Sequence, residues 1–210
     1  MVVIGVIGGV ASGKSLVCEH FRELGATLLN ADREGHAVLD EPAVRDALRS
    51  RWGDSIFRAD GAVDRPSVAR LVFAPPPDGP RDRAFLDRTT HPRIGERLLE
   101  RLAECRRTND RACVILDAAL LFEAGWDRLC DRIVFVDATD DQRRQRAESR
   151  GWTAEQWRAR ETAQLSLAAK RQQADWIVDN SHSLDETRAQ VARIWAEITS
   201  AAPTLSSWPP

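Results

Sequence analysis

The sequence contains no tyrosine, a single methionine and no long apolar run. No stretch approaches the roughly 20 consecutive apolar residues of a membrane-spanning helix, so we expect no membrane segment. The 30 basic and 32 acidic residues give a formal net charge of −2. This balance lacks the basic excess of nucleic-acid binders, so we expect no nucleic-acid partner. Lysine is also scarce, since only Lys14 and Lys170 are lysines, and a motif that includes one therefore carries weight.

Cysteine is scarce as well. The four cysteines are scattered without a Cys-x-x-Cys pair, at Cys18, Cys105, Cys113 and Cys130. This spacing predicts reduced, buried thiols. A chain of this length buries enough surface to need neither disulfides nor a structural metal for stability. The segment Met1–Gly5 lacks the basic region and cleavage site of a signal peptide, so we expect a cytoplasmic protein.

Short apolar runs rich in valine and isoleucine recur along the chain without polar alternation, as in buried parallel strands. They span Val2–Ile7, Ala26–Leu29, Ala112–Leu116, Arg132–Val136 and Trp176–Val178. Helix-like stretches lie between them, at Ser15–Leu24, Arg93–Arg106, Asp140–Arg150, Ala154–Ala174 and Leu184–Ser200. This alternation predicts a doubly wound α/β fold around a parallel sheet of five strands.

About eighty residues separate the second apolar run from the third, which predicts an inserted lobe at about 33–100. Two helices are expected within it, over Ala43–Trp52 and Arg65–Phe73. The next segment, Ala74–Pro80, is rich in proline, which predicts a loop without regular structure. We expect the inserted lobe and the core to move relative to each other.

A glycine-rich motif follows the first apolar run, because Gly8–Ser15 matches G-x-x-x-x-G-K-[ST]. A strand before the motif and a helix after it are the context of a phosphate-binding loop rather than of an ordinary glycine turn. Glycines let backbone N–H groups converge on an anion, and the helix N-terminus adds partial positive charge. We therefore predict ATP binding, with Lys14 on the β and γ phosphates and Ser15 as a ligand of Mg²⁺. The residues expected to wrap the phosphates are Ala11, Ser12, Gly13, Lys14, Ser15 and Leu16.

Two motifs that mark other classes of nucleotide-binding protein are absent from the sequence. Neither lysine lies in an N-K-x-D motif of the kind that reads guanine in GTPases, and no transporter-type glycine signature is present. A kinase of a small molecule is the remaining common class. The second strand leads to Asp32, and the carboxyl ends of neighbouring parallel strands face one crevice, so Asp32 should lie near the transferred phosphate. Its carboxylate could accept the proton of an attacking hydroxyl or could cap the following helix.

Several further segments form a pattern that covers nearly the whole chain. The loop segment Ile7–Val17 is followed by Phe21–Gly25, which reads F-R-E-L-G, and by Leu29–Asp32, which reads L-N-A-D. Later segments of the pattern are Asp60–Arg65, Leu71–Phe73, His91–Pro92, Leu120–Glu123, Ala174–Asp175 and Asp179–Asn180. In this order, and to about residue 195, they resemble the dephospho-CoA kinase family.

The resemblance implies transfer of the γ-phosphate of ATP to the ribose 3′-hydroxyl of a small molecule, dephospho-CoA, in the last step of coenzyme A biosynthesis. It implies a P-loop kinase of the nucleoside-monophosphate-kinase-like fold, with one domain over 1–200 and Asp32 as the base. The inserted lobe would bind the acceptor, and a lid would lie at about 140–172. Residues 201–210, rich in proline and serine, are expected to form a flexible tail.

Arg146 and Arg150 resemble the lid arginines that close over phosphates in such kinases. Residues four apart on a helix share one face, and the arginine fork suits phosphate oxygens. We expect both to bind the nucleotide, and Arg146 to act in catalysis with Lys14 and Asp32, although a solvated basic face is the alternative. Less specific matches to lid positions are Arg160, Gln164 and Lys170.

Two more polar residues have open roles. His91 lies where the inserted lobe returns to the core, and it could serve the acceptor region or be a satisfied histidine at a helix start. Asp117 closes the third strand and could hold Mg²⁺ through water or act as a cap. The chain departs from the family pattern at Leu16, Asn30, His36 and Ala119. His36 replaces a permanent cation by a titratable one, which is expected to weaken an acceptor contact.

Two other functions stay open on the residues alone. A kinase of the same fold could act on another small acceptor, such as a nucleoside monophosphate. A non-catalytic, nucleotide-dependent regulatory module is the second alternative, in which Asp32 would only cap a helix.

Overall fold

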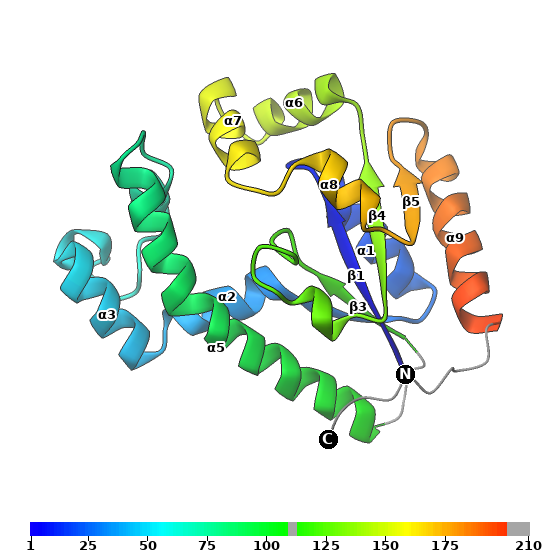
Figure 1. Ribbon diagram of the computed structural model, residues 1–210, viewed down its shortest axis with the longest axis horizontal. Helices are drawn as coiled ribbons and strands as arrows, with labels where there is room; N and C mark the ends of the chain where they lie inside the picture. The colour runs from blue at the N-terminus through cyan, green and yellow to red at the C-terminus, as the bar shows by residue number, and fades with distance from the viewer. Residues whose placement is uncertain (109–112, 201–210) are drawn as a thin grey trace.

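A computed structural model of the protein describes residues 1–108 and 113–200. Five strands form one parallel sheet in the order β2-β3-β1-β4-β5 (Figure 1). The strands are β1 (Val2–Gly8), β2 (Thr27–Asn30), β3 (Cys113–Asp117), β4 (Arg132–Asp137) and β5 (Trp176–Asp179). The predicted α/β fold with five parallel strands is therefore confirmed. Ala112, at the expected start of the third strand, and the expected tail at 201–210 lie outside the described residues.

The central strand β1 is buried on both faces, as expected for a strand without polar alternation. Val3 and Ile7 face one hydrophobic layer, whereas Ile4 and Val6 face the other. All four side chains are at most 1% exposed. The sheet is thus the middle of three layers, and the helices must supply both outer layers.

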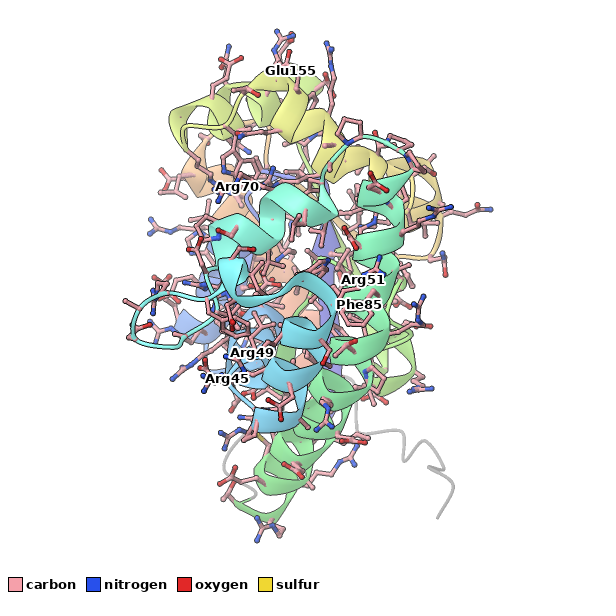
Figure 2. The ribbon with its side chains drawn as sticks, turned by 90° about the vertical axis from the view of Figure 1, so that its left-hand side faces the viewer. Arg45, Arg49, Arg51, Arg70, Phe85 and Glu155 are labelled. Carbon is pink, nitrogen blue, oxygen red and sulfur yellow. The ribbon has the colours of Figure 1, made fainter. Side chains whose placement is uncertain are left out.

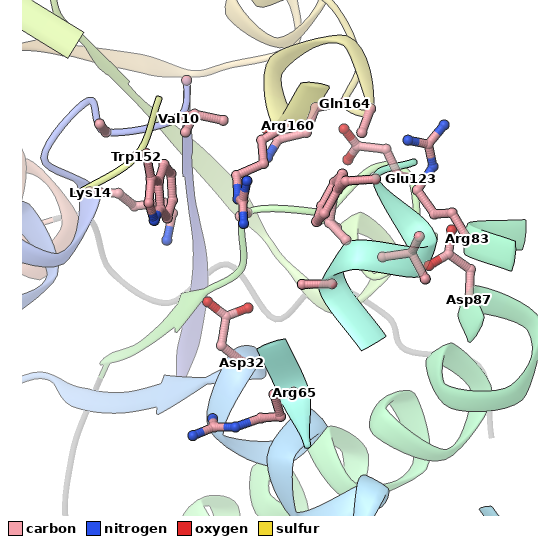
Figure 3. A pocket seen from close by; sticks show the side chains of 18 of the residues that line it. Val10, Lys14, Asp32, Arg65, Arg83, Asp87, Glu123, Trp152, Arg160 and Gln164 are labelled. Carbon is pink, nitrogen blue, oxygen red and sulfur yellow. The ribbon is translucent and has the colours of Figure 1, made fainter. Parts of the chain in front are cut away.

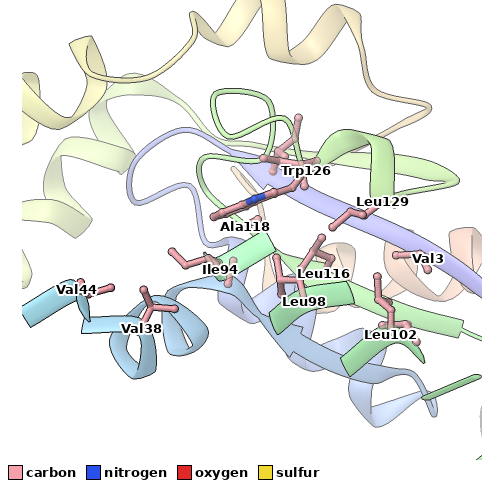
Figure 4. Packing of buried hydrophobic residues seen from close by; sticks show 14 of the residues in the cluster. Val3, Val38, Val44, Ile94, Leu98, Leu102, Leu116, Ala118, Trp126 and Leu129 are labelled. Atoms are coloured by element: carbon pink, nitrogen blue, oxygen red, sulfur yellow. The ribbon is translucent and has the colours of Figure 1, made fainter. Parts of the chain in front are cut away.

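Helices α1 (Lys14–Glu23) and α9 (Leu184–Ser200) cover the layer that contains Ile4 and Val6. The 31-residue helix α5 (Asp78–Thr108) crosses the opposite layer, and Figure 4 shows Leu98 and Leu102 directed toward the sheet. Both leucines are at most 2% exposed. One end of α5 thus seals the core while its other end extends into the inserted lobe (Figure 1).

The strand register brings the ends of three strands together at one edge of the sheet, with polar residues at the ends of β2 and β3. Val6 of β1 pairs with Asp117 of β3, and Asn30 of β2 pairs with the same residue. Just beyond this point β1 leads into the motif Gly8–Ser15, whose loop connects Gly8 at the end of β1 to Lys14 at the start of α1. The carboxyl ends of the strands therefore form a common edge at which a ligand can bind.

The inserted lobe is helical, as predicted. It contains α2 (Ala31–Leu39), α3 (Pro42–Trp52), the short 3-10 helix η1 (Asp54–Ile56), α4 (Arg65–Val72) and the first part of α5. Figure 2 shows Arg51 beside Phe85, and the guanidinium carbon of Arg51 lies 5.7 Å from the centroid of the Phe85 ring. The ring of Trp52 meets the same phenyl ring edge-on, with centroids 5.3 Å apart. These contacts join α3 to α5.

Helix α5 begins at Asp78, so the prediction of a loop over the whole of Ala74–Pro80 is wrong. Pro80 lies in the first turn, where its missing N–H removes no bond of the helix. Gly79 allows the chain to approach itself closely, because an added Cβ would lie 1.8 Å from the carbonyl oxygen of Ala74. Proline in this segment therefore accompanies the start of a helix and does not indicate that the whole segment is a loop.

The helix expected over Arg93–Arg106 is also too short, since α5 continues through Pro92. A proline inside a helix removes one backbone hydrogen bond, so tertiary contacts must offset that loss. Asp82 supplies some of them, because its carboxylate accepts hydrogen bonds from Arg51 Nη2 at 2.8 Å and from Trp52 Nε1 at 3.0 Å. Packing against α3 thus keeps the part of α5 before the proline helical.

The segment at about 140–172, which we expected to form a lid and refer to as the lid, contains three helices rather than two. They are α6 (Asp140–Ser149), α7 (Ala154–Thr162) and α8 (Leu167–Gln172). The single helix expected over Ala154–Ala174 is interrupted because the side chain of Ser166 accepts a hydrogen bond from the backbone N–H of Ala169 and starts a new helix there.

All four cysteines are free. Cys18 and Cys113 are buried as expected, whereas Cys105 and Cys130 are only partly buried. Burial raises the pKa of the Cys113 and Cys130 thiols to about 12 each, so both stay protonated at neutral pH. Within the described ranges, no helix is both long enough and apolar enough to cross a membrane.

The seal between α5 and the sheet can be tested with two adjacent leucines. Leu98 is fully buried, whereas Leu99 is 45% exposed. Leu98→Ala should lower the free energy of unfolding by about 2–5 kcal/mol, because it leaves a cavity in the core. Leu99→Ala should change it by less than about 0.5 kcal/mol. Urea denaturation of the two variants checks this expectation, and equal losses would contradict it.

Candidate active site

The phosphate-binding motif lies between β1 and α1 in a conformation that depends on its glycines. Gly13 is the residue before α1 and has a φ of 96°, in the left-handed region that favours glycine. An added Cβ at Gly13 would lie 2.0 Å from Nδ2 of Asn180, and one at Gly8 would lie 2.4 Å from Oγ of Ser12. The loop is therefore closely surrounded, and its backbone N–H groups are presented at the start of a helix.

Side chains of α6 and of the segment after β5 hold this loop from behind. Asn180 Nδ2 and Arg146 Nη1 both donate to the carbonyl oxygen of Ser12, at 2.8 and 3.0 Å. Arg146 Nη2 also donates to the carbonyl oxygen of Asn180, at 2.9 Å. The sequence marks Asn180 only as part of the family pattern. Its contact with Ser12 has no local signal, because the two residues are 168 positions apart.

The lid supports the same loop through a partly buried ion pair. Glu161 of α7 accepts a hydrogen bond from the backbone N–H of Val10 at 2.6 Å, and its other oxygen lies 2.7 Å from Arg143 Nη1. Arg143 is 4% exposed and also pairs with Asp140. Gly9 leaves room for it, since an added Cβ there would lie 2.6 Å from Arg143 Nη1. This pair is a second feature that the sequence analysis missed.

A cavity of about 510 Å³ opens in front of the loop (Figure 3). It lies between the phosphate-binding motif, the inserted lobe and the lid. Its polar lining includes Lys14, Ser15, Asp32, His36, Arg65, Arg83, Asp87, His91, Glu123, Arg150, Arg160 and Gln164. Of the predicted site residues, Ala11 to Ser15, Asp32 and Arg150 line it, whereas Leu16 and Arg146 do not.

Lys14 forms an ion pair with Asp117, which is 4% exposed. Burial lowers the pKa of Lys14, but the Asp117 carboxylate, with smaller contributions from Cys18 and Asp32, offsets this, so the pKa is raised overall. Lys14 is therefore a cation at neutral pH. The capping role considered for Asp117 is wrong, because its carboxylate serves Lys14 and also accepts a hydrogen bond from Asn30 Nδ2 at 2.9 Å.

Asn30 also decides whether Asp32 caps the helix that follows β2. The side-chain oxygen of Asn30 accepts a hydrogen bond from the backbone N–H of Arg33 at 2.8 Å, so Asn30 caps α2. Asp32 lies in the first turn of that helix and is exposed. Its interpretation as the cap is wrong, and its carboxylate faces the cavity (Figure 3).

Lys170 anchors the lid and does not reach the cavity. Its fully buried ammonium donates to the carbonyl oxygen of Ala119 at 3.0 Å and to Gln164 Oε1 at 2.8 Å, and it lies 3.2 Å from Glu123 Oε1. Glu123 in turn accepts a hydrogen bond from the backbone N–H of Leu165 at 2.6 Å. Burial lowers the pKa of Lys170. These contacts tie the last turn of α8 and the residue Leu165 before this helix to the segment after β3.

His91 lies inside α5, so its interpretation as a histidine at a helix start is wrong. Its ring meets Trp126 edge-on, with centroids 5.4 Å apart, and its Nε2 lies 3.4 Å from Asp87. Burial lowers the pKa of His91. It lines the cavity wall on the side of the inserted lobe.

Comparison with known proteins agrees with this geometry. A family model described as dephospho-CoA kinase matches residues 2–186. A curated dephospho-CoA kinase of Symbiobacterium thermophilum is 40% identical over 93% of this chain and 80% of that protein. Another, of Chlorobaculum tepidum, is 34% identical over 93% of this chain and 94% of that protein. The chain belongs to the dephospho-CoA kinase family.

Solved structures support the same fold. A Thermus thermophilus protein is 29% identical, with a TM-score of 0.76 over 93% of this chain and 97% of that one. A shikimate kinase of Acinetobacter baumannii, 14% identical, has a TM-score of 0.54 over 98% of this chain and 96% of that one. The second likeness concerns the fold alone, which is that of P-loop kinases.

The structure shows which contacts are made at two positions, His36 and Ala119, where the chain departs from the dephospho-CoA kinase pattern. His36 lies beside Arg65, whose Nη1 is 2.9 Å from His36 Nδ1. Burial and the Arg65 charge lower the pKa of His36, so the ring is neutral at pH 7 and accepts this bond. The guanidinium of Arg65 is thus a permanent positive charge next to the titratable ring of His36. Ala119 supplies its carbonyl oxygen to Lys170.

Asn30 should be important for stability in this dephospho-CoA kinase family member, because its amide serves two partners at once. Asn30→Ala removes the cap of α2 and the donor to Asp117, and we expect a loss of about 1–3 kcal/mol in the free energy of unfolding. Asn30→Ser keeps a capping oxygen but is too short for Asp117, so about 1 kcal/mol should return. Urea denaturation measures both, and equal stability of the two variants would refute the dual role.

Proposed function

We propose that this protein transfers the γ-phosphate of ATP to the ribose 3′-hydroxyl of dephospho-CoA and releases coenzyme A and ADP, the last step of coenzyme A biosynthesis. One observation carries the assignment: a single cavity joins the phosphate-binding motif, Asp32 and the inserted lobe in a chain of this family. The phosphate end would hold the donor, and the inserted lobe would hold the acceptor.

The chain offers a suitable place for ATP and Mg²⁺. The left-handed Gly13 and the start of α1 present backbone N–H groups, as a phosphate cradle requires. Lys14 is a cation, and the exposed hydroxyl of Ser15 lines the cavity as a magnesium ligand would. When bound, ATP supplies the phosphoryl group and Mg²⁺ neutralises part of its charge. Ala11, Ser12 and Leu16 complete the proposed cradle.

Asp32 is the proposed base. Its carboxylate would accept the proton of the acceptor hydroxyl as that oxygen forms a bond to the γ-phosphorus. The bond from the γ-phosphorus to the oxygen bridging it to the β-phosphate breaks at the same time, and ADP leaves with that oxygen. Lys14 would stabilise negative charge on the transferred group. For that role its ammonium must exchange part of its contact with Asp117 for a phosphate oxygen.

The lid arginines would act from the other side of the phosphates. Arg150 is exposed and lines the cavity, so it is free to bind a phosphate oxygen. Arg146 uses two of its N–H groups on the carbonyls behind the loop, and its remaining donors are proposed to serve the nucleotide. A closed lid would exclude water and so suppress hydrolysis of ATP.

The deciding assay is ADP release from ATP and Mg²⁺ by the purified protein. We expect rapid release only with dephospho-CoA, and a product one phosphate heavier by mass spectrometry. Nucleoside monophosphates serve as control acceptors, and faster turnover with one of them would reassign the acceptor. ATP binding without stimulation by any acceptor would instead indicate a regulatory module.

Asp32→Asn separates catalysis from nucleotide binding. We expect kcat to fall roughly 100- to 10,000-fold, because the amide cannot take up the proton. The Kd for ATP, measured by calorimetry, should stay close to that of the wild type. Lys14→Ala is the contrasting variant, since it should weaken ATP binding as well as abolish transfer. Wild-type turnover by Asp32→Asn would exclude this residue as the base.

A further inference from the structure

Arg160 of α7 lies in contact with aromatic rings of two different parts of the molecule. Its guanidinium carbon is 4.3 Å from the ring centroid of Trp152, in the connection between α6 and α7. The same carbon is 4.7 Å from the ring centroid of Phe73, the residue that directly follows α4 in the inserted lobe. Arg160 therefore bridges the lid and the inserted lobe, and Phe73, Trp152 and Arg160 all line the cavity.

No carboxylate of the described chain forms an ion pair with this guanidinium. One donor, Nη1, bonds to the carbonyl oxygen of Gln156 in its own helix at 3.0 Å. Burial lowers the pKa of Arg160, and no acidic neighbour raises it. Lys14, which lines the same cavity, differs in this respect because it has Asp117 as a partner. A partly buried cation without a counter-ion is unfavourable, so the position has the charge requirement of an anion site.

The ring contacts leave the hydrogen-bond donors of Arg160 other than the one bonded to Gln156 available. A guanidinium that lies against aromatic rings presents its π faces to them, while its N–H groups point outward in its own plane. Figure 3 shows the Arg160 side chain extending from the lid into the cavity, in the direction of Asp32. The space between Arg160 and Asp32 is where the proposed transfer would occur.

We propose that Phe73 and Trp152 are positioning residues that hold Arg160 with its donors toward the transferred phosphate, so that phosphoryl transfer depends on contact between the inserted lobe and the lid. The role of Arg160 in this arrangement rests on the proposed kinase function. Phe73 belongs to the lobe that would bind the acceptor, and its ring makes the position of a lid residue depend on that lobe.

Arg160→Lys tests the stack without removing the charge, because a lysine ammonium has no planar face to rest on two rings. We expect kcat with dephospho-CoA to fall roughly 100-fold, the loss typical of one donor to a developing charge. The Kd for inorganic tripolyphosphate, measured by calorimetry, should rise only several-fold, because the transition state is bound more strongly than the ground state. Arg158→Lys, at an exposed position of the same helix, is the matched control and should behave as the wild type.

Phe73→Leu tests whether the inserted lobe acts through Arg160. It should lower kcat roughly three- to tenfold in the wild-type background, as expected for loss of one cation–π contact. In the Arg160→Lys background it should lower kcat no further, because the contact is already gone. Thermal unfolding confirms that each variant is folded.

Three results would overturn the inference. They are full kcat in Arg160→Lys, an equal loss in Arg158→Lys, or a loss from Phe73→Leu that is the same in both backgrounds. Failure of the wild type itself to phosphorylate dephospho-CoA would instead remove the proposed function. In that case unchanged tripolyphosphate affinity in Arg160→Lys still counts against Arg160 as an anion-binding residue.

Discussion

The ion pair between Lys14 and Asp117 is the interaction on which the rest of the candidate site depends. Asp117 is almost fully buried at the end of β3, and a buried carboxylate is unfavourable unless it is paired and hydrogen-bonded. Lys14 comes from the phosphate-binding motif after β1, and Asn30 comes from the end of β2. One carboxylate therefore brings together the three strand ends that form the edge of the cavity. Because Asn30 also caps α2, this carboxylate indirectly places Asp32.

The phosphate-binding motif is held from the opposite side by the second half of the chain. Asn180 and Arg146 bind the carbonyl oxygen of Ser12, and Glu161 binds the backbone N–H of Val10. Both ends of the loop are thus fixed by side chains of the lid and of the segment after β5. The lid therefore has a structural role in this loop in addition to the covering role proposed for it.

The sequence was most informative where a signal is local. Strands buried on both faces appear as unbroken apolar runs, and the motif Gly8–Ser15 carries its own turn chemistry, so both were predicted correctly. The start of α5 was not, because proline is compatible with a first helical turn as well as with a loop. The two open roles of Asp32 could not be separated either. Its neighbour Asn30 is an equally good cap, and only the structure shows which of the two side chains accepts the bond.

The sequence by itself determined the α/β class, the phosphate-binding motif and the family resemblance, since each depends on residues that are close together in the chain. The tertiary structure alone decided that Asn180 and Glu161 hold the loop, that Asp117 pairs with Lys14, and that Arg160 meets Phe73. Such contacts join side chains many residues apart. Their partners are selected by strand register and helix packing, which a linear pattern of residue types does not record.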